Sequence, residues 1–132
     1  MKLIPRPLRK AVFGLKPFDR RKHPRLKPDK EIPCFCVYED SNQRLEFPVE
    51  IMNISKGGSL IITSEYKVYP GTKVELKFKP PLQQEFSIIK GKILRTFRPR
   101  HQYIYYSGIK FDEGNEKNIQ LLIDSVVDQK QV

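Results

Sequence analysis

The 132-residue sequence predicts a mostly-β domain of about six strands, a small barrel or sandwich, that ends in one α-helix. Three observations predict this fold: apolar and polar residues alternate in several segments, Gly and Pro turn signals separate those segments, and the periodicity becomes helical near the end. Hydrophobic residues make up 39% of the chain, which is enough for one core. We therefore expect a single globular domain.

Period-two alternation and β-forming residues locate the strands. The clearest case is Val74, Leu76 and Phe78, which alternate with charged residues before the Pro80-Pro81 pair. The six expected strands cover residues 34–38, 45–52, 59–64, 73–79, 85–97 and 102–111. A Pro-Gly turn at residues 70–71 and a basic turn at residues 98–101 separate neighbouring strands.

The last segment has helical periodicity. Ile119, Leu122, Ile123 and Val126 fall on one face of a helix, and Asn115 stands where an N-cap residue would. Glu116 near the positive end of the helix dipole favours the same start. Because the helix has one apolar stripe, we expect it to close an open end of the barrel.

The charge and the amino-terminal segment bear on partners and location. The chain has 25 Lys and Arg against 15 Asp and Glu, a formal charge of +10, which favours anionic partners. Residues 1–19 are basic and interrupted by proline, so they are expected to form a tail or linker before a domain at residues 20–132. They lack the continuous apolar stretch of a signal peptide, and no run approaches the roughly 20 residues of a membrane span. A cytoplasmic protein is expected.

The two cysteines are expected to be structural. Cys34 and Cys36 lie two residues apart in an expected strand, so both point to one face. Because no second cysteine pair exists and both histidines are distant in sequence, buried or half-buried thiols are favoured over a metal site.

A first candidate site is the segment DRRKHPR at residues 19–25, which contains Arg21 and Arg25 in an R-x-x-x-R pattern. Guanidinium groups bind phosphate oxygens bidentately, pair with the O6 and N7 edge of guanine, and stack on purines. Pro24 disfavours a helix here, so the segment is expected to be a loop or an extended arm. Taken alone, a solvated basic linker would be the simpler interpretation of this segment.

A second candidate site is the segment NISKGG at residues 53–58, between two expected strands. Asn53 and Ser55 can cap a turn or present donors and acceptors to a ligand, and the glycines permit close backbone approach. On turn chemistry alone, a plain hairpin turn would be the simpler interpretation.

Taken together and in this order, the two segments resemble the signature of the PilZ family, R-x-x-x-R followed by [Asp/Asn]-x-Ser-x-x-Gly. The resemblance covers about residues 20–127, and YSGIKF at residues 106–111 is similar to a late strand of that family. It implies a six-stranded antiparallel β-barrel with a C-terminal α-helix. It also implies that the chain binds the bacterial second messenger cyclic di-GMP and needs no other cofactor.

The resemblance also implies roles for individual residues. The ligand-binding residues would be Arg20, Arg21, Arg25, Asn53, Ser55 and Gly58. The arginines would contact phosphate and guanine, and Asn53 and Ser55 would meet a guanine edge. In that family, an additional arginine directly before the R-x-x-x-R pair accompanies the binding of two stacked ligand molecules. Arg20 occupies that place in this sequence. We expect the arm to become ordered on binding and to signal to a protein partner that the sequence does not name.

The main alternative is a small basic β-barrel that binds single-stranded RNA or DNA. Tyr103, Tyr105 and Tyr106 could stack on bases. However, Tyr103 and Tyr105 share an expected strand face with Ile109 and Phe111, so a core role is favoured and no nucleic acid is expected. No carboxylate pair, Ser-His-Asp set or triphosphate-binding loop is visible, so an enzyme is not expected.

Overall fold

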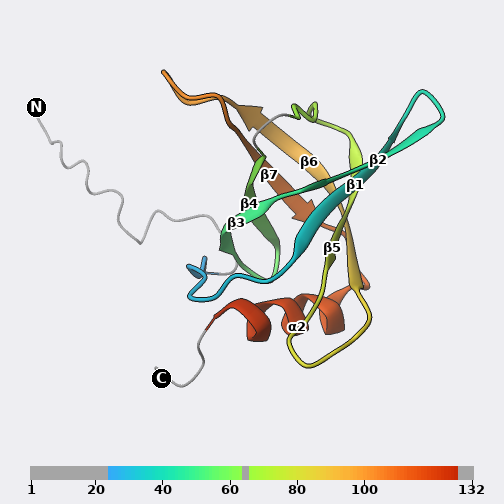
Figure 1. Cartoon of the computed structure of the whole chain (residues 1–132), viewed down its shortest axis with the longest axis vertical. Coiled ribbons are helices and arrows are strands. Elements are labelled where there is room, and N and C mark those ends of the chain that lie inside the picture. Colours follow the sequence, from blue (N-terminus) through green and yellow to red (C-terminus); the bar gives the residue numbers. More distant parts are fainter. Residues whose placement is uncertain (1–23, 64–65, 128–132) are drawn as a thin grey trace, which may run out of the picture.

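The computed structural model describes residues 24–63 and 66–127 and contains one antiparallel sheet and one helix (Figure 1). The strands are β1 (Cys34–Asp40), β2 (Gln43–Pro48), β3 (Glu50–Ile54), β4 (Gly58–Thr63), β5 (Lys73–Phe78), β6 (Ser87–Phe97) and β7 (Tyr105–Phe111), and the helix is α2 (Glu116–Val126). The order across the sheet is β2-β1-β5-β6-β7-β4-β3. The mostly-β fold with a C-terminal helix is confirmed, with seven strands where six were predicted.

The extra strand arises because the segment at residues 45–52 changes partner in its middle. β2 pairs with β1 as far as Pro48, whereas β3 pairs with β4 from Glu50 onward. Pro48 has no N–H to donate, and the Val49 N–H donates to the Cys34 carbonyl at 3.0 Å, in register with the β1–β2 ladder, just before β3 begins at Glu50. The two edge strands of the sheet are therefore consecutive in the chain, and the sheet curls back on itself as a barrel does (Figure 1).

The core lies inside this curled sheet and under the helix. In β5, Val74, Leu76 and Phe78 are all buried, as their alternation predicted. Ile119, Leu122, Ile123 and Val126 of α2 are buried as well, and the helix lies across one open end of the sheet (Figure 1). The predicted apolar stripe and its packing role are thus confirmed.

Both ends of α2 are tied to neighbouring segments. Asn115 precedes the helix as predicted, but its side chain donates to the Asp112 carbonyl at 2.9 Å and makes no capping hydrogen bond. At the other end, the Val126 carbonyl accepts hydrogen bonds from the N–H groups of Asp29, at 2.7 Å, and Lys30, at 3.1 Å. Because the last carbonyls of a helix lack intrahelical partners, these bonds fasten the segment before β1 to the helix.

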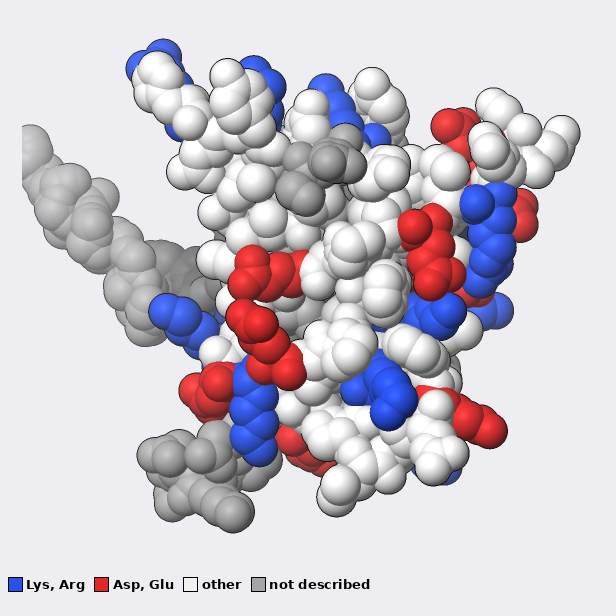
Figure 2. Space-filling view, in the orientation of Figure 1, with Lys and Arg blue, Asp and Glu red and all other residues white. Residues whose placement is uncertain are grey.

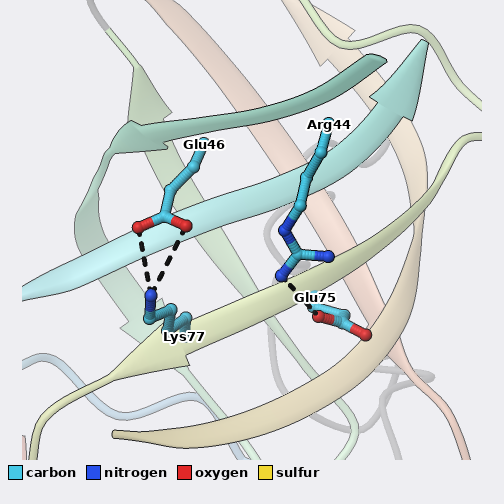
Figure 3. Close-up of polar contacts among 4 residues, drawn as sticks. All are labelled: Arg44, Glu46, Glu75 and Lys77. Atoms are coloured by element: carbon cyan, nitrogen blue, oxygen red, sulfur yellow. Dashed lines mark hydrogen bonds and ion pairs between the residues drawn. The ribbon is translucent and has the colours of Figure 1, made fainter. Parts of the chain in front are cut away.

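The outer face of β1 is covered by two ion pairs (Figure 3). The Lys77 ammonium lies 3.2 Å from the Glu46 carboxylate, and the Arg44 guanidinium lies 3.7 Å from that of Glu75. Each pair joins β2 to β5 across β1. Between them Val37, paired in register with Glu46 and Glu75, is only 2% exposed although it lies outside the core cluster. The side chains around Val37 therefore shield it from solvent on the outer face.

Cys34 and Cys36 are free, buried thiols on the inner face of β1, as predicted. Burial raises the pKa of both thiols to about 12, so they stay protonated near neutral pH. Within residues 24–63 and 66–127, no cluster of three or more His, Cys, Asp or Glu side chains could hold a metal ion. In the same residues, no helix has the length and apolar character to cross a membrane.

Candidate ligand-binding site

The segment at residues 53–58 forms the tight turn between β3 and β4, and Ser55 holds it together. Ser55 is 5% exposed. Its hydroxyl accepts a hydrogen bond from the Gly57 N–H at 3.2 Å and donates to the Gly58 carbonyl at 3.4 Å. The Ser55 N–H also donates to the Gly58 carbonyl, at 2.8 Å. In this structure the serine side chain therefore stabilises the turn.

Gly58 is required by the packing of two strands. It pairs with Lys110 of β7, and a Cβ added at Gly58 would lie 2.2 Å from the carbonyl oxygen of Ile109. No side chain fits at that distance, so β4 can approach β7 this closely only with glycine here. The sequence suggested that this glycine gives a ligand access to the turn, and the close strand approach is a separate reason for it.

The segment before β1 runs beside the open edge of β3. The Leu26 N–H donates to the Ile54 carbonyl at 2.7 Å, and the Ile54 N–H donates back to Leu26 at 2.9 Å. This pairing places Arg25 next to Asn53, and the Arg25 guanidinium donates to the Asn53 side-chain carbonyl at 2.7 Å. The two candidate segments, 28 residues apart in sequence, thus meet at one edge of the barrel. Arg20 and Arg21 lie outside the described residues.

From Asn53, a row of residues continues across the outer face of the sheet. Asn53 pairs with Leu60 of β4, Leu60 with Gly108 of β7, and Gly108 with Arg95 of β6. The neighbouring row is buried and fixes which face is outward; it consists of Ile54, Ser59, Ile109 and Ile93. Gly108 adds no side chain, and a Cβ there would meet the Arg95 side chain at 3.5 Å. Leu60 and Gly108 therefore form a shallow surface, which we call the platform. It lies between Asn53 and Arg95, whose strands are about 14 Å apart across the sheet.

A row of lysines borders this platform. Lys110 lies opposite Gly58, Lys92 lies opposite Lys110, and Lys73 lies opposite Lys92 on three adjacent strands. All three are exposed, and none forms an ion pair with another described residue. Like charges directly opposite each other destabilise a sheet, so this face favours the approach of an anion.

Three residues of this site, Ser59, Leu60 and Arg95, were not predicted from the sequence. Ser59 is fully buried, and its hydroxyl donates to the Asn53 backbone carbonyl at 2.7 Å, which fixes the end of β3. Alternation within β4 could have placed Leu60 on the outer face. Arg95 could not be placed by alternation, because a register shift interrupts β6 between Ile93 and Arg95.

The prediction that Tyr103 packs in the core is wrong. β7 begins at Tyr105, and Tyr103 lies in the preceding turn with 85% of its surface exposed. The expected strand at residues 102–111 extended the alternation through the turn, which includes His101 with a positive φ of 64°. Ile109 and Phe111 are buried as predicted.

Comparison with known proteins gives a family and a fold. A profile described as the PilZ domain matches residues 19–128. No curated protein matches the chain in sequence. Among solved structures, the fold is similar to the inhibitor of motility MotI/DgrA from Bacillus subtilis, with a TM-score of 0.58 and 18% identity over 80% of this chain and 49% of that one.

Two further solved structures are similar, and both are complexes. The PilZ domain of YcgR from Escherichia coli with c-di-GMP gives a TM-score of 0.55 and 17% identity over 82% of this chain and 92% of that one. The MrkH–c-di-GMP complex from K. pneumoniae gives 0.56 and 16% identity over 80% of this chain and 49% of that one. The chain thus spans about half the length of the MotI/DgrA and MrkH chains.

Proposed function

This chain belongs to the PilZ domain family, and we propose that it is a receptor that binds cyclic di-GMP on the outer face of the barrel beside β3. The observation that carries the proposal is the hydrogen bond from Arg25 to Asn53, because it brings the arginine-rich arm and the Asn-x-Ser-x-x-Gly turn into one place. The c-di-GMP complexes of similar fold support the choice of ligand.

The roles follow from the chemistry of each group. Arg21 and Arg25 would bind the phosphates and the guanine O6 and N7 edge, because a guanidinium offers planar, forked donors. Asn53 would accept from the Watson–Crick edge of a guanine with its side-chain carbonyl, which Arg25 occupies in the free protein. Ser55 and Gly58 would contribute by shaping the turn that positions Asn53.

The rest of the outer face suits the remainder of the ligand. The platform of Leu60 and Gly108 is low and half-buried, so a planar base could lie on it. Lys110 and Lys92 would supply positive charge beside that base for the second phosphate. Each charge-assisted hydrogen bond contributes about 1.5–3 kcal/mol, so four or five contacts are sufficient for micromolar affinity.

As a receptor, the domain at residues 20–132 would report ligand binding through its arm. Bound phosphates would neutralise the clustered cations of residues 20–25 and fix the arm against β3, and the tail at residues 1–19 would move with it. A protein partner would then read the position of the tail.

Titration calorimetry tests ligand binding. We expect micromolar or tighter affinity for cyclic di-GMP and much weaker binding of GMP, which lacks the second base and phosphate. If Arg20 holds a second molecule, the wild type should bind two ligands per chain and Arg20→Ala nearer one. An absence of heat at tens of micromolar protein would reject the receptor function, whereas a ratio of one in both proteins would reject only the role of Arg20.

A further inference from the structure

The end of the β6–β7 hairpin projects beyond the barrel (Figure 1). Several large apolar side chains of this hairpin are exposed. We define the hairpin tip as Leu94, Phe97, Arg98, Arg100 and Tyr103. Leu94 is 56% exposed, Phe97 43% and Tyr103 85%. Three large apolar side chains thus face solvent in one short stretch of chain, and none of the three is assigned to the proposed cyclic di-GMP site.

An irregularity in β6 turns one of these side chains outward. The register between β6 and β7 shifts between Ile93 and Arg95, so the alternation of inner and outer faces is broken there. Ile93 is 1% exposed, and the next residue, Leu94, together with Arg95, faces solvent. Bulges of this kind redirect side chains at the ends of barrels.

The same hairpin is strongly basic. Between Phe86 and Phe111 the sequence contains no Asp or Glu. It contains six Lys and Arg, namely Lys90, Lys92, Arg95, Arg98, Arg100 and Lys110. In Figure 2, Lys and Arg atoms lie along the upper left end of the molecule, where the hairpin projects, with no acidic atoms among them. An acidic or phosphate-bearing surface could therefore approach the tip without meeting a like charge.

Arginines beside exposed leucine, phenylalanine and tyrosine suit the surface of an anionic bilayer. The cations bind lipid phosphates, and amphipathic rings and aliphatic side chains enter the headgroup region. We propose that the hairpin tip docks this protein on an anionic lipid surface, with Leu94, Phe97 and Tyr103 entering the headgroup layer and Arg98 and Arg100 binding phosphates. This goes beyond cyclic di-GMP binding and does not depend on it.

The arrangement of the rings favours a bilayer over a single-stranded nucleic acid. Base stacking needs a free aromatic face. Phe97 is already stacked on Tyr106, with ring centroids 5.2 Å apart, and the Arg95 guanidinium lies 5.7 Å from the centroid of the same ring. Leu94 has no ring for a base to stack on. A lipid surface needs only exposed apolar area, which all three side chains provide.

Fluorescence of the full chain tests the docking directly, because the sequence contains no tryptophan. A single Tyr103→Trp substitution places a probe at the tip. We expect a blue shift of its emission with vesicles of phosphatidylcholine and phosphatidylglycerol, and none with phosphatidylcholine alone. Leu82→Trp is the control, since Leu82 is fully exposed in the loop between β5 and β6, away from the tip. Its emission should stay unchanged with both kinds of vesicle.

Vesicle sedimentation then assigns the charges. Each cation near an anionic surface contributes about fivefold to binding, so the double variant Arg98→Gln and Arg100→Gln should bind about 25-fold more weakly. Lys30→Gln with Lys117→Gln removes the same amount of charge, at the two ends of α2, and should bind as the wild type does. This comparison within the full chain is needed because residues 1–23 are also basic. Cyclic di-GMP affinity should be equal in the wild type and in both double variants.

Several results would overturn the proposal. These are an absent shift at Tyr103→Trp, an equal shift at Leu82→Trp, equal binding to neutral vesicles, and equal losses in the two double variants. A blue shift caused by oligothymidylate and not by anionic vesicles would assign the tip to nucleic acid instead. None of these results affects calorimetry with cyclic di-GMP, so the two functions can fail separately.

Discussion

At the scale of single residues, the proposed site depends on one contact between two distant segments. The guanidinium of Arg25 and the amide of Asn53 are 2.7 Å apart, at the edge of β3. In the free protein this hydrogen bond uses one donor of Arg25 and the side-chain acceptor of Asn53. A bound guanine could take the place of Asn53 as acceptor or of Arg25 as donor. The contact thus keeps both side chains in place without a ligand.

Arg25→Ala should weaken cyclic di-GMP binding by about a hundredfold, because it removes charge-assisted hydrogen bonds worth about 2–3 kcal/mol. Arg25 is exposed and lies outside the core, so the melting temperature should change little. Calorimetry and thermal unfolding of the same samples check both statements. Ser55→Ala, which alters the turn and not the cation, should have a smaller effect on affinity. Unfolding of Arg25→Ala would show that the arm is structural.

Gly58→Ala should destabilise the domain by about 1–3 kcal/mol, since the new methyl group would meet the Ile109 carbonyl oxygen at 2.2 Å and force β4 from β7. Gly108→Ala is the matched control on the facing strand, because its Cβ would meet only the flexible Arg95 side chain at 3.5 Å. Urea denaturation of both variants measures the difference. Equal stabilities would contradict the close strand approach.

At the scale of elements, Lys73, Lys92 and Lys110 form a row of like charges on β5, β6 and β7. Removing one of these charges should therefore stabilise the free protein. Lys92→Gln removes the central charge of three neighbours, so the free protein should be more stable by a few tenths of a kcal/mol. Cyclic di-GMP binding should weaken by roughly twofold to fivefold, as expected for an exposed cation. In the control, Lys77→Gln removes a lysine that pairs with Glu46, so stability should fall slightly and affinity should not change. A less stable Lys92→Gln protein would show that the row is not under repulsion.

The arm at residues 20–25 is the second element for which the effect of ligand binding can be tested. Leu26 and Ile54 already exchange two backbone hydrogen bonds in the free protein, so the part of the arm nearest β1 is held against β3. We therefore expect ligand to slow amide hydrogen exchange at residues 20–23 and at Arg25, while Leu26 and Ile54 change little. Hydrogen exchange followed by NMR resolves these positions. Unchanged exchange throughout residues 20–25 would mean a preformed site and no switch of the arm.

The elements also show what the sequence could and could not predict. Strict alternation predicted β5, and the apolar stripe predicted α2, because both patterns are local. The division of residues 45–52 at Pro48 was missed, because alternation continues through a strand that changes its pairing partner. The meeting of Arg25 with Asn53 depends on backbone pairing between Leu26 and Ile54, for which no side chain gives a signal.

At the scale of the whole molecule, the family and the mostly-β fold followed from two short motifs and the strand pattern, and both are confirmed. The shape of the binding face did not follow, because it depends on which strands become neighbours. Asn53, Leu60, Gly108 and Arg95 come from four strands and form one row only in the folded sheet. Their spacing in the sequence therefore does not predict that they form a row.

The pairing of β4 with β7 has a consequence for the rates of folding and unfolding. β3–β4 and β6–β7 are local hairpins, whereas β4 and β7 are separated in sequence by β5 and β6, with Thr63 opposite Tyr105. Pairings between strands distant in sequence slow folding. A ligand that lies from Asn53 across to Gly108 would contact both β4 and β7 and so bridge their pairing. The ligand would then bind only after the pairing has formed. In stopped-flow experiments, cyclic di-GMP should slow unfolding and leave the refolding rate unchanged, so a ligand-bound receptor would persist longer before each opening of the barrel.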